Sequence, residues 1–398
     1  MPEMDRRKAL RRLGLIGAAA GAGAAGLATG SGFAGAAEKP GASGFAASVR
    51  PAGRASTTLE IPQMTVLVDR PEAAPGLIYY NADGMVIADR HGVTKNFLAS
   101  PKICSDFRPQ TYQGRRVLTW WEQGDNDLNS GGTLHRADLS FTVEDEITEF
   151  GAFRPGMHEF AITPQNTALL TIYQRIPYDL RPVGGPAEGL LTDSLWVEVD
   201  LASRQVLNQW RASDHVPITD TYARLPTDPA ESFDYFHINS VSPDVDGNIL
   251  ICARHTSAIY KTDRRGHRLL WTMGGKSSDY RVDGDASFSW QHDAQAVDAF
   301  TIRLFDNASD GTAVDRPHSR VIWVRRDPWT KKVSLVREWI HPEGVSSYAM
   351  GNAQKLANGN TFVGWGSSMR VSEVDRRGRL VFDATLPDLC YRGYRFAD

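Results

Sequence analysis

The segments Asp246-Gly-Asn-Ile-Leu250 and Asp263-Arg-Arg-Gly-His-Arg-Leu269 decide the fold of this chain, because each of them occurs twice. They recur 112 residues later as Asn358-Gly-Asn-Thr-Phe362 and Asp375-Arg-Arg-Gly-Arg-Leu380, the latter with one residue fewer. Residues 237–266 match the stretch 112 positions further on without a gap. A match of this length indicates an internal structural repeat.

Each copy of the repeat reads as short strands joined by hairpin turns. In the first copy an alternating run extends from Ile249 to Tyr260, and a turn at Arg265-Gly266 precedes Leu269-Leu-Trp271. No segment of the chain shows helical periodicity. The offset of 112 residues suits two four-stranded units of about 55 residues, near the period of propeller blades, and six such units fit after residue 60. The sequence therefore predicts an all-β chain folded as a six-bladed β-propeller with four-stranded antiparallel blades.

Three histidines occupy corresponding places in successive copies of the repeat. Blades are predicted to start near Leu77, Val117, His158, His237, His292 and Ala349. Equivalent positions in successive blades face the central axis at one height, and propellers usually bind ligands at a mouth of the central channel. We therefore expect the imidazoles of His158, His237 and His292 to converge at one mouth.

The repeat also separates functional candidates from residues that the blade itself needs. At the 112-residue offset, His237, Asn239 and Arg254 align with Ala349, Gly351 and Gly366. Because the second copy lacks these polar side chains, a blade folds without them. The three polar residues are therefore candidates for a functional site.

The composition is that of a globular protein with a large core. Of the 398 residues, 41% are hydrophobic and 10% are aromatic, which suits one propeller domain over residues 61–398. The formal net charge of −3 gives no sign of a nucleic-acid partner. Gly275-Lys-Ser277 resembles the end of a phosphate-binding loop, but the first glycine of that motif would have to stand at Leu270. A nucleotide site is therefore not expected.

The cysteines suggest no metal site. Cys104, Cys252 and Cys390 are an odd set without the spacing of metal ligands. The mid-strand position of Cys252 is typical of a buried, inert thiol. A disulfide between Cys104 and Cys390 is one option for the other two. We expect no metal and no organic cofactor.

Residues 1–36 have the pattern of an export signal. Arg6-Arg7 and Arg11-Arg12 precede an uncharged, Gly- and Ala-rich stretch, in which Ala34-Gly-Ala36 supplies a small-residue cleavage site. The low hydrophobicity of this stretch favours the twin-arginine pathway over a membrane anchor; the alternative is a disordered basic tail. Residues 37–60 read as a flexible linker, and no later run is long enough to span a bilayer. We expect an exported monomer without stable membrane insertion.

Five spaced motifs stand out between residues 235 and 310. They are Phe236-His-Ile-Asn-Ser-Val241, Ala253-Arg-His-Thr-Ser-Ala-Ile-Tyr-Lys261, Leu270-Trp-Thr-Met-Gly-Gly275, Phe288-Ser-Trp-Gln-His-Asp-Ala294 and Leu304-Phe-Asp-Asn307. In order and spacing they resemble the motifs of the bacterial arylsulfate sulfotransferase family, and looser similarity extends over residues 150–385. The resemblance implies a six-bladed propeller that uses an aryl sulfate donor instead of a nucleotide sulfate, in agreement with the missing phosphate loop.

The resemblance also implies roles for five residues. It implies that His292 takes the sulfuryl group. It places His237, Asn239 and Arg254 around the sulfuryl oxygens, and His158 corresponds to the remaining histidine of the family site.

The chain departs from the family pattern in two places. Met157 stands where the family often has a second histidine beside His158. A hydroxyl that the family contributes from the last blade has no counterpart near Tyr348-Ala-Met-Gly-Asn352. These departures bear on donor binding.

The residue types suit sulfuryl transfer. A loose transition state asks the enzyme mainly to align the nucleophile with the leaving oxygen and to hold the other oxygens. A neutral imidazole is a suitable nucleophile at neutral pH. Transfer to His292 would release a phenol, and an acceptor phenol would then reclaim the group in a ping-pong cycle, with His158 or His237 moving the phenolic proton. The predicted partners are a phenolic sulfate donor and a phenolic acceptor.

Two alternatives from other functional classes stay open. A family-like propeller could have lost transfer and could bind a sulfated or aromatic ligand without turnover. The three imidazoles could instead hold a metal and support hydrolysis or oxidation, although a nearby Arg254 argues against a bound cation.

Other aromatic and histidine residues are expected to have structural roles. By strand alternation, His255 is expected to face away from Arg254 and to pack against neighbouring residues. Trp271, Trp290 and Trp365 are expected in the core between blades. The histidines expected at the surface or in loops are His135, His215, His267, His318 and His341.

Overall fold

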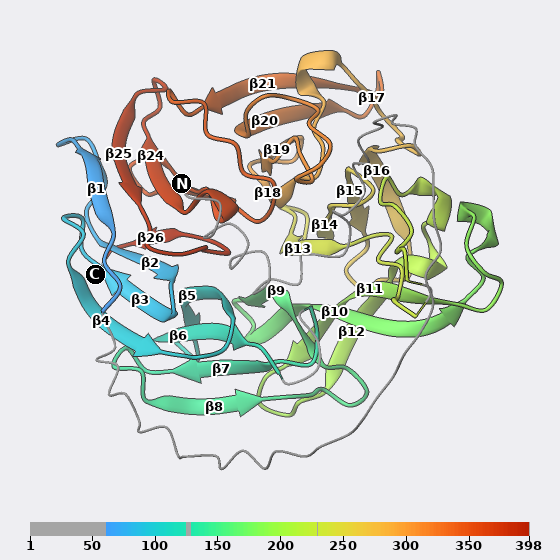
Figure 1. Cartoon of the computed structure of the whole chain (residues 1–398), viewed down its shortest axis with the longest axis horizontal. Helices are drawn as coiled ribbons and strands as arrows, with labels where there is room; N and C mark the ends of the chain where they lie inside the picture. The colour runs from blue at the N-terminus through green and yellow to red at the C-terminus, as the bar shows by residue number, and fades with distance from the viewer. Residues whose placement is uncertain (1–60, 125–128, 229, 398) are drawn as a thin grey trace, which may run out of the picture.

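Six sheets surround a central axis as the blades of a β-propeller (Figure 1). The computed structural model describes residues 61–124, 129–228 and 230–397. The predicted six-bladed, all-β fold is therefore confirmed. Within these residues, helical structure is limited to short 3-10 turns, and no helix is long and apolar enough to cross a membrane. The predicted signal peptide (1–36) and linker (37–60) lie outside the described residues.

Blades two to four are antiparallel meanders whose strands follow one another outward from the channel. The second blade contains β5 (Cys104–Tyr112), β6 (Arg115–Glu122), β7 (Thr133–Ala137) and β8 (Val143–Ile147). The third contains β9 (Pro155–Ile162), β10 (Thr167–Tyr178), β11 (Gly189–Asp200) and β12 (Val206–Arg211). The fourth contains β13 (Ile238–Pro243), β14 (Ile249–Ala253), β15 (Ala258–Thr262) and β16 (Leu269–Gly274).

The remaining blades carry extra strands or are built from both ends of the chain. The fifth contains β18 (His292–Ala296), β19 (Thr301–Asp306), β20 (Arg320–Asp327) and β21 (Lys332–Ile340), with β17 (Arg281–Val282) added in parallel at its outer edge. The sixth contains β22 (Asn352–Lys355), β23 (Thr361–Gly364), β24 (Arg370–Val374), β25 (Leu380–Thr385) and β1 (Thr65–Asp69). The first contains β26 (Tyr394–Phe396), β2 (Leu77–Asn81), β3 (Gly84–Ala88) and β4 (Thr94–Ala99).

Both chain ends close the ring by hydrogen bonding. β1 forms the outer edge of the last blade by pairing antiparallel with β25, and β26 supplies the inner strand of the first blade by pairing with β2. Figure 1 shows the blue β1 beside the red β25, and the red β26 beside β2. These pairings close the ring of blades. They also bring residues near the C-terminus to the channel.

Four of the six predicted blade starts agree with the structure. His158 lies three residues into β9, His237 directly precedes β13, and His292 begins β18. Ala349 lies three residues before β22.

The other two predicted starts are wrong by one strand. Val117 lies in β6, the second strand of its blade, because the inner strand β5 begins at Cys104. Leu77 begins β2, which is also a second strand, because the inner strand β26 comes from the C-terminus. A local repeat cannot reveal an inner strand that is contributed from the far end of the chain.

Aromatic side chains fill the spaces between blades. Trp271 and Trp365 lie in such clusters, as predicted. One histidine predicted at the surface or in a loop is instead buried in a strand: His135 lies in β7 and stacks on Trp120 with ring centroids 4.8 Å apart. An imidazole ring packs well against indole, which explains this error. His341 lies in a loop, as predicted, and is buried there.

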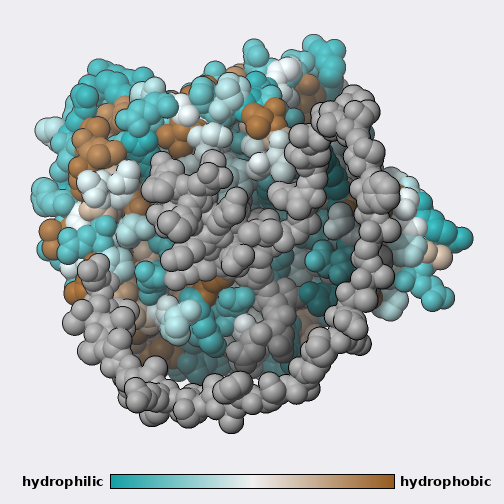
Figure 2. All heavy atoms as spheres, viewed as in Figure 1, coloured by the Kyte–Doolittle hydropathy of each residue, from teal (hydrophilic) through white to brown (hydrophobic). Residues whose placement is uncertain are grey.

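The three cysteines are free thiols, so the predicted option of a Cys104–Cys390 disulfide is wrong. All three are buried, and burial raises the pKa of each thiol to about 12. Cys252 is inert in this sense, as predicted. Figure 2 shows that hydrophilic side chains predominate along the rim of the face seen in Figure 1.

Candidate active site

The predicted channel histidines come together at one end of the inner strands of blades three, four and five. The rings of His158 and His237 have centroids 4.9 Å apart and nearly perpendicular planes. His292 is close enough for its protonation to be coupled electrostatically to that of His158 and His237. The alignment of the repeats therefore located a real cluster.

Bulges at the entrance of the inner strands shape this cluster. The pairing of β13 with β14 shifts register between Ile238 and Ser240, and the pairing of β18 with β19 shifts between His292 and Gln295. His237 has a φ of 54°, in the left-handed region that residues other than glycine seldom adopt. Bulges and strained backbone are typical of functional sites, where they redirect side chains.

One hydrogen bond determines which nitrogen of His292 can react. The amide nitrogen of Asn307 donates to the carbonyl oxygens of Ser347 and Met350, both at 2.9 Å, so its Oδ1 faces His292. That oxygen lies 2.7 Å from His292 Nδ1 and can only accept, so Nδ1 carries the proton. The lone pair of His292 is therefore on Nε2. The backbone N–H of Met350 points at Nε2 from 3.3 Å.

Burial keeps two of the imidazoles uncharged. His158 and His292 are each 3% exposed. Burial lowers the pKa of each imidazole well below its ordinary value of 6.5, and the neighbouring His237 for His158 and the neighbouring Arg254 for His292 add to this effect. At neutral pH both rings therefore have a lone pair available.

Asp234 is a site residue that the sequence reasoning missed. Its Oδ2 lies 2.5 Å from His237 Nδ1, and its Oδ1 accepts the backbone N–H of His237 at 3.1 Å. Burial acts to raise the pKa of Asp234, but His237 and His255 outweigh it and hold that pKa below the ordinary value. The carboxylate orients His237 and leaves its Nε2 facing away from Asp234. The spacing of Asp234 three residues before His237 was the available signal.

Arg254 lies in the cluster and His255 lies beside it, contrary to the prediction for His255. Arg254 Nη2 donates to the carbonyl of Tyr348 at 3.0 Å, and its Nη1 lies 3.0 Å from His255 Nε2. The prediction failed because β14 ends at Ala253, so strand alternation no longer applies at residue 255. Burial lowers the pKa of His255 to about 3.

Trp290 forms the outer support of Arg254. The guanidinium carbon lies 5.2 Å from the centroid of the indole, an arrangement that stabilises a cation over an aromatic face. Trp290 is buried, as predicted, and it also lines a pocket between blades four and five.

Asn239 joins blades four and five. It is completely buried, and its amide donates to the carbonyl of Gln291 at 2.7 Å. An amide nitrogen carries two hydrogens, so this bond uses one of the two. The carbonyl of Asn239 accepts hydrogen bonds from Arg392 Nη2 at 3.0 Å and from the Tyr391 hydroxyl at 3.1 Å.

A buried ionic network supports the histidines from the closing segment of the chain. Arg392 is 1% exposed and pairs with Glu159 and Asp106, in each case at 3.0 Å. Arg108 also contacts both carboxylates. Glu159 follows His158 directly in β9. No pattern along the chain indicates this network, because its members are up to 286 residues apart.

The loop before the last blade approaches the cluster with backbone atoms. Tyr348 offers its carbonyl to Arg254, and Met350 offers its N–H to His292.

Within the described part of the chain, the ring nitrogens of His158, His237 and His292 do not form a set close enough to hold one metal ion. The set that could hold an ion there is Asp234, His237 and His255, whose ligand atoms lie within 4.8 Å of one another. Hydrogen bonds already use Nδ1 of His237 and of His255, and the guanidinium of Arg254 adjoins the set. The positive charge of Arg254, whose Nη1 lies 3.0 Å from His255 Nε2, repels a metal ion at this set.

The family comparison agrees with this geometry. Residues 108–386 match the family model described as arylsulfotransferase (ASST). The chain belongs to the arylsulfotransferase (ASST) family. The family confirms the resemblance found in the sequence, and it implies a small-molecule aryl donor and acceptor. A search of curated proteins gave no match.

Solved structures with a similar chain path differ widely from this arylsulfotransferase in sequence. A protein of unknown function from Bacteroides caccae aligns with a TM-score of 0.48 and 11% identity over 80% of this chain and 98% of that one. A streptogramin B lyase aligns with a TM-score of 0.38 and 10% identity over 81% of this chain and 84% of that one. Virginiamycin B lyase from Staphylococcus aureus aligns with a TM-score of 0.40 and 8% identity over 81% of this chain and 83% of that one. Similarities of this size carry no information on function.

Proposed function

We propose that this arylsulfotransferase moves a sulfuryl group from a phenolic sulfate ester to a phenol, without a nucleotide, in a ping-pong cycle through a sulfohistidine at His292. The observation that carries the proposal is the single tautomer of His292. Its Nδ1 proton is directed to Asn307, and its pKa lies well below 6.5 because of burial and the nearby Arg254. A buried neutral imidazole beside a guanidinium suits attack on an anionic sulfate ester.

The two half-reactions are reverses of one another. In the first, the Nε2 lone pair of His292 forms a bond to sulfur while the bond from sulfur to the phenolic oxygen breaks, and the phenol leaves after taking a proton. In the second, the acceptor phenol gives up its proton, its oxygen bonds to sulfur, and the bond from Nε2 to sulfur breaks. When Nε2 of His292 attacks sulfur, it gives up its contact with the N–H of Met350, which lies 3.3 Å away.

Arg254 and Asn239 are the proposed donors to the sulfuryl oxygens. The guanidinium is held between Tyr348 and Trp290, and Asn239 keeps one amide hydrogen after bonding Gln291. Fixed donors of this kind stabilise charge in the transition state at little reorganisation cost.

His237 is the proposed proton carrier. Asp234 holds its Nδ1, so Nε2 of His237 can give a proton to the leaving phenolate and take one from the acceptor. His158 is less suited to give a proton, because burial and His237 hold its pKa well below 6.5. Its Nδ1 lies 3.2 Å from the hydroxyl of Tyr173, which in turn donates to Ile238, so His158 supports the site.

The test is nitrophenolate release from 4-nitrophenyl sulfate by the protein, with and without phenol, alongside His292→Asn. Phenol-dependent release that is lost in the variant is expected. A sulfated peptide containing His292, trapped without acceptor and identified by mass spectrometry, would establish the intermediate. Release into water that persists in His292→Asn would overturn the proposal in favour of hydrolysis.

Location outside the cytoplasm is part of the proposal and rests on the sequence of residues 1–36. Fractionation of cells that express the full chain tests it. Replacement of Arg6-Arg7 by Lys-Lys is expected to retain the protein in the cytoplasm.

A further inference from the structure

His255 is a largely buried imidazole that the proposed mechanism does not use. It lies in the turn of residues 254–257, which joins β14 to β15, and its side chain is 16% exposed. The turn is tight: the backbone N–H of Ser257 donates to the carbonyl of Arg254 at 3.2 Å, and Ser257 has a φ of 48°. A turn this short keeps the side chains of Arg254 and His255 close together.

The sixth blade contains the same turn without an imidazole. Met369 lies 112 residues after Ser257, and its φ of 51° is close to that of Ser257. In this second turn, Gly366-Ser367 stands where the fourth blade has Arg254-His255. The turn therefore forms without His255. The imidazole and the guanidinium are absent together from the second copy, which indicates that the two side chains act together.

The main chain fixes one tautomer of His255. Its Nδ1 lies 2.5 Å from the carbonyl oxygen of Asp234, which can only accept, so Nδ1 carries a proton. Burial lowers the pKa of His255 to about 3, so the ring is neutral at neutral pH and its lone pair is on Nε2. Arg254 Nη1, which can only donate, lies 3.0 Å from that Nε2. His255 therefore accepts a hydrogen bond from Arg254.

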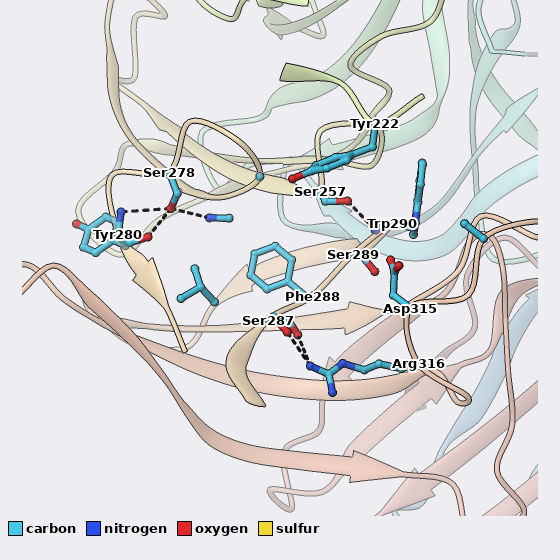
Figure 3. Close-up of a pocket in the computed structure, with 14 residues that line it drawn as sticks. Tyr222, Ser257, Ser278, Tyr280, Ser287, Phe288, Ser289, Trp290, Asp315 and Arg316 are labelled. Atoms are coloured by element: carbon cyan, nitrogen blue, oxygen red, sulfur yellow. Dashed lines mark hydrogen bonds between the residues drawn. The ribbon is translucent and has the colours of Figure 1, made fainter. Parts of the chain in front are cut away.

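Three groups hold the guanidinium of Arg254 in place. His255 accepts from Nη1, and the carbonyl of Tyr348 accepts from Nη2 at 3.0 Å. The ring centroid of Trp290 lies 5.2 Å from the guanidinium carbon. Trp290 is joined to the same turn, because its backbone N–H donates to Ser257 Oγ at 3.3 Å (Figure 3). Together these contacts fix the position and the plane of the guanidinium.

These contacts leave one N–H of Arg254 without a partner. The Nε atom is buried, and within the residues that the structure describes no group accepts its hydrogen. A buried donor without an acceptor is costly, and an anion that binds beside it would remove that cost. Because the arginine side chain is long and flexible, the contacts of Nη1 and Nη2 determine where this N–H points.

We propose that His255 is a positioning residue, which holds the guanidinium of Arg254 in the orientation that binds the sulfuryl oxygens. The inference rests on the proposed function, in which Arg254 donates to these oxygens. Fixed donors lower the barrier only while their geometry is kept, and small misplacements reduce the rate strongly. Asp234 then sets two imidazoles: its main-chain carbonyl fixes the tautomer of His255, and its carboxylate orients His237.

The test compares two amides at position 255. Glutamine extends its side-chain carbonyl to the region of Nε2 and can accept from Arg254, whereas asparagine ends near Nδ1 and reaches only the carbonyl of Asp234. With 4-nitrophenyl sulfate as donor and phenol as acceptor, kcat/KM is expected to fall roughly tenfold in His255→Asn and to stay within about twofold of the wild type in His255→Gln. His255→Leu, which has no side-chain acceptor, is the second variant and is expected to match His255→Asn. Equal losses in all three variants indicate a packing role and overturn the proposal.

A double-mutant cycle shows whether His255 acts through Arg254. In the Arg254→Ala protein, His255→Asn is expected to cause no further loss of kcat/KM, because the group that it positions is gone. A further loss as large as that in the wild-type background would mean that His255 acts on another group, such as His237, whose ring centroid lies 4.6 Å away. That result overturns the proposal.

Calorimetric titration of 4-nitrophenyl sulfate into the His292→Asn protein separates this inference from the proposed function, because it needs no turnover. Addition of His255→Asn is expected to weaken binding at least about threefold, and addition of His255→Gln to leave it unchanged. This result supports the positioning role even if no sulfuryl transfer occurs in the wild type. Unchanged binding and unchanged kcat/KM in His255→Asn overturn the positioning role and leave phenol-dependent transfer intact.

Discussion

Asn307 Oδ1 lies 2.7 Å from His292 Nδ1 and decides which nitrogen of the histidine carries the lone pair. Asn307 is itself held by two main-chain carbonyls in the loop before the last blade. Blades five and six together therefore fix the tautomer of His292. The hydrogen bond thus connects the arrangement of the blades to the reactivity of one atom.

Replacement of Asn307 by Leu is expected to lower kcat by roughly 10²–10³-fold, because the imidazole loses its orientation at little cost in volume. Asn307→Asp restores an acceptor for Nδ1 and is expected to recover part of the activity. Its carboxylate raises the pKa of His292, so the acidic limb of the kcat/KM profile moves to higher pH. The profiles of both variants are compared by nitrophenolate release. Wild-type kcat in Asn307→Leu, with an unchanged thermal midpoint, would contradict this role.

Arg254→Ala is expected to reduce kcat/KM for the donor by about 10²–10³-fold, because the transition state loses a fixed charged donor. Arg254→Lys keeps the charge but not the planar group that lies over Trp290. Its kcat/KM is therefore expected to lie between those of the wild type and Arg254→Ala. Steady-state kinetics with 4-nitrophenyl sulfate measure both variants. Equal activity of Arg254→Lys and the wild type would show that charge alone suffices.

The free energy of unfolding is expected to decrease as pH falls below about 6.5 toward 3, partly because of His255. The pKa of His255 is about 3 in the folded protein, against an ordinary value of 6.5. In this window the unfolded chain binds a proton that the folded chain does not, so acid favours unfolding. His255→Gln is expected to reduce the slope of the free energy of unfolding against pH, as measured by urea denaturation at several pH values. An identical slope in the variant would exclude His255 as a contributor.

Arg392→Met is expected to destabilise the fold by about 3–5 kcal/mol, because it leaves two buried carboxylates to share Arg108 as their remaining cationic partner. These are Asp106 and Glu159, each 3.0 Å from the Arg392 guanidinium. Denaturant unfolding measures the loss. Arg268→Met serves as the control, because Arg268 pairs with Asp263 at the surface and is 75% exposed. A loss no greater than that of the control would show that the network is not stabilising.

Much of the fold and part of the site could be predicted from local patterns. The spacing of the repeat predicted six blades, and the alignment of the repeat placed His158, His237 and His292 at equivalent points. Two of the wrong predictions, for Val117 and His255, concern residues whose place depends on where a strand starts or ends. Strand ends depend on hydrogen bonds to a neighbour, which an alternation pattern does not contain.

The roles of Asp234, Asn307 and Arg392 could not be derived from patterns, because each depends on contacts. Asn307 was visible inside a family motif, yet its function requires the position of the loop at residues 347–350. Arg392 reaches the site only because the C-terminal segment closes the first blade. Neither contact leaves a periodic signal.

The sequence by itself determined the all-β architecture, the number of blades and the set of channel histidines, because these follow from turn residues, strand periodicity and a repeat that is written along the chain. Only the tertiary structure decided which nitrogen of His292 is free and which carboxylate orients His237. These properties arise between blades, where residues far apart in sequence meet, and hydrogen-bond geometry there is set by packing of the whole ring.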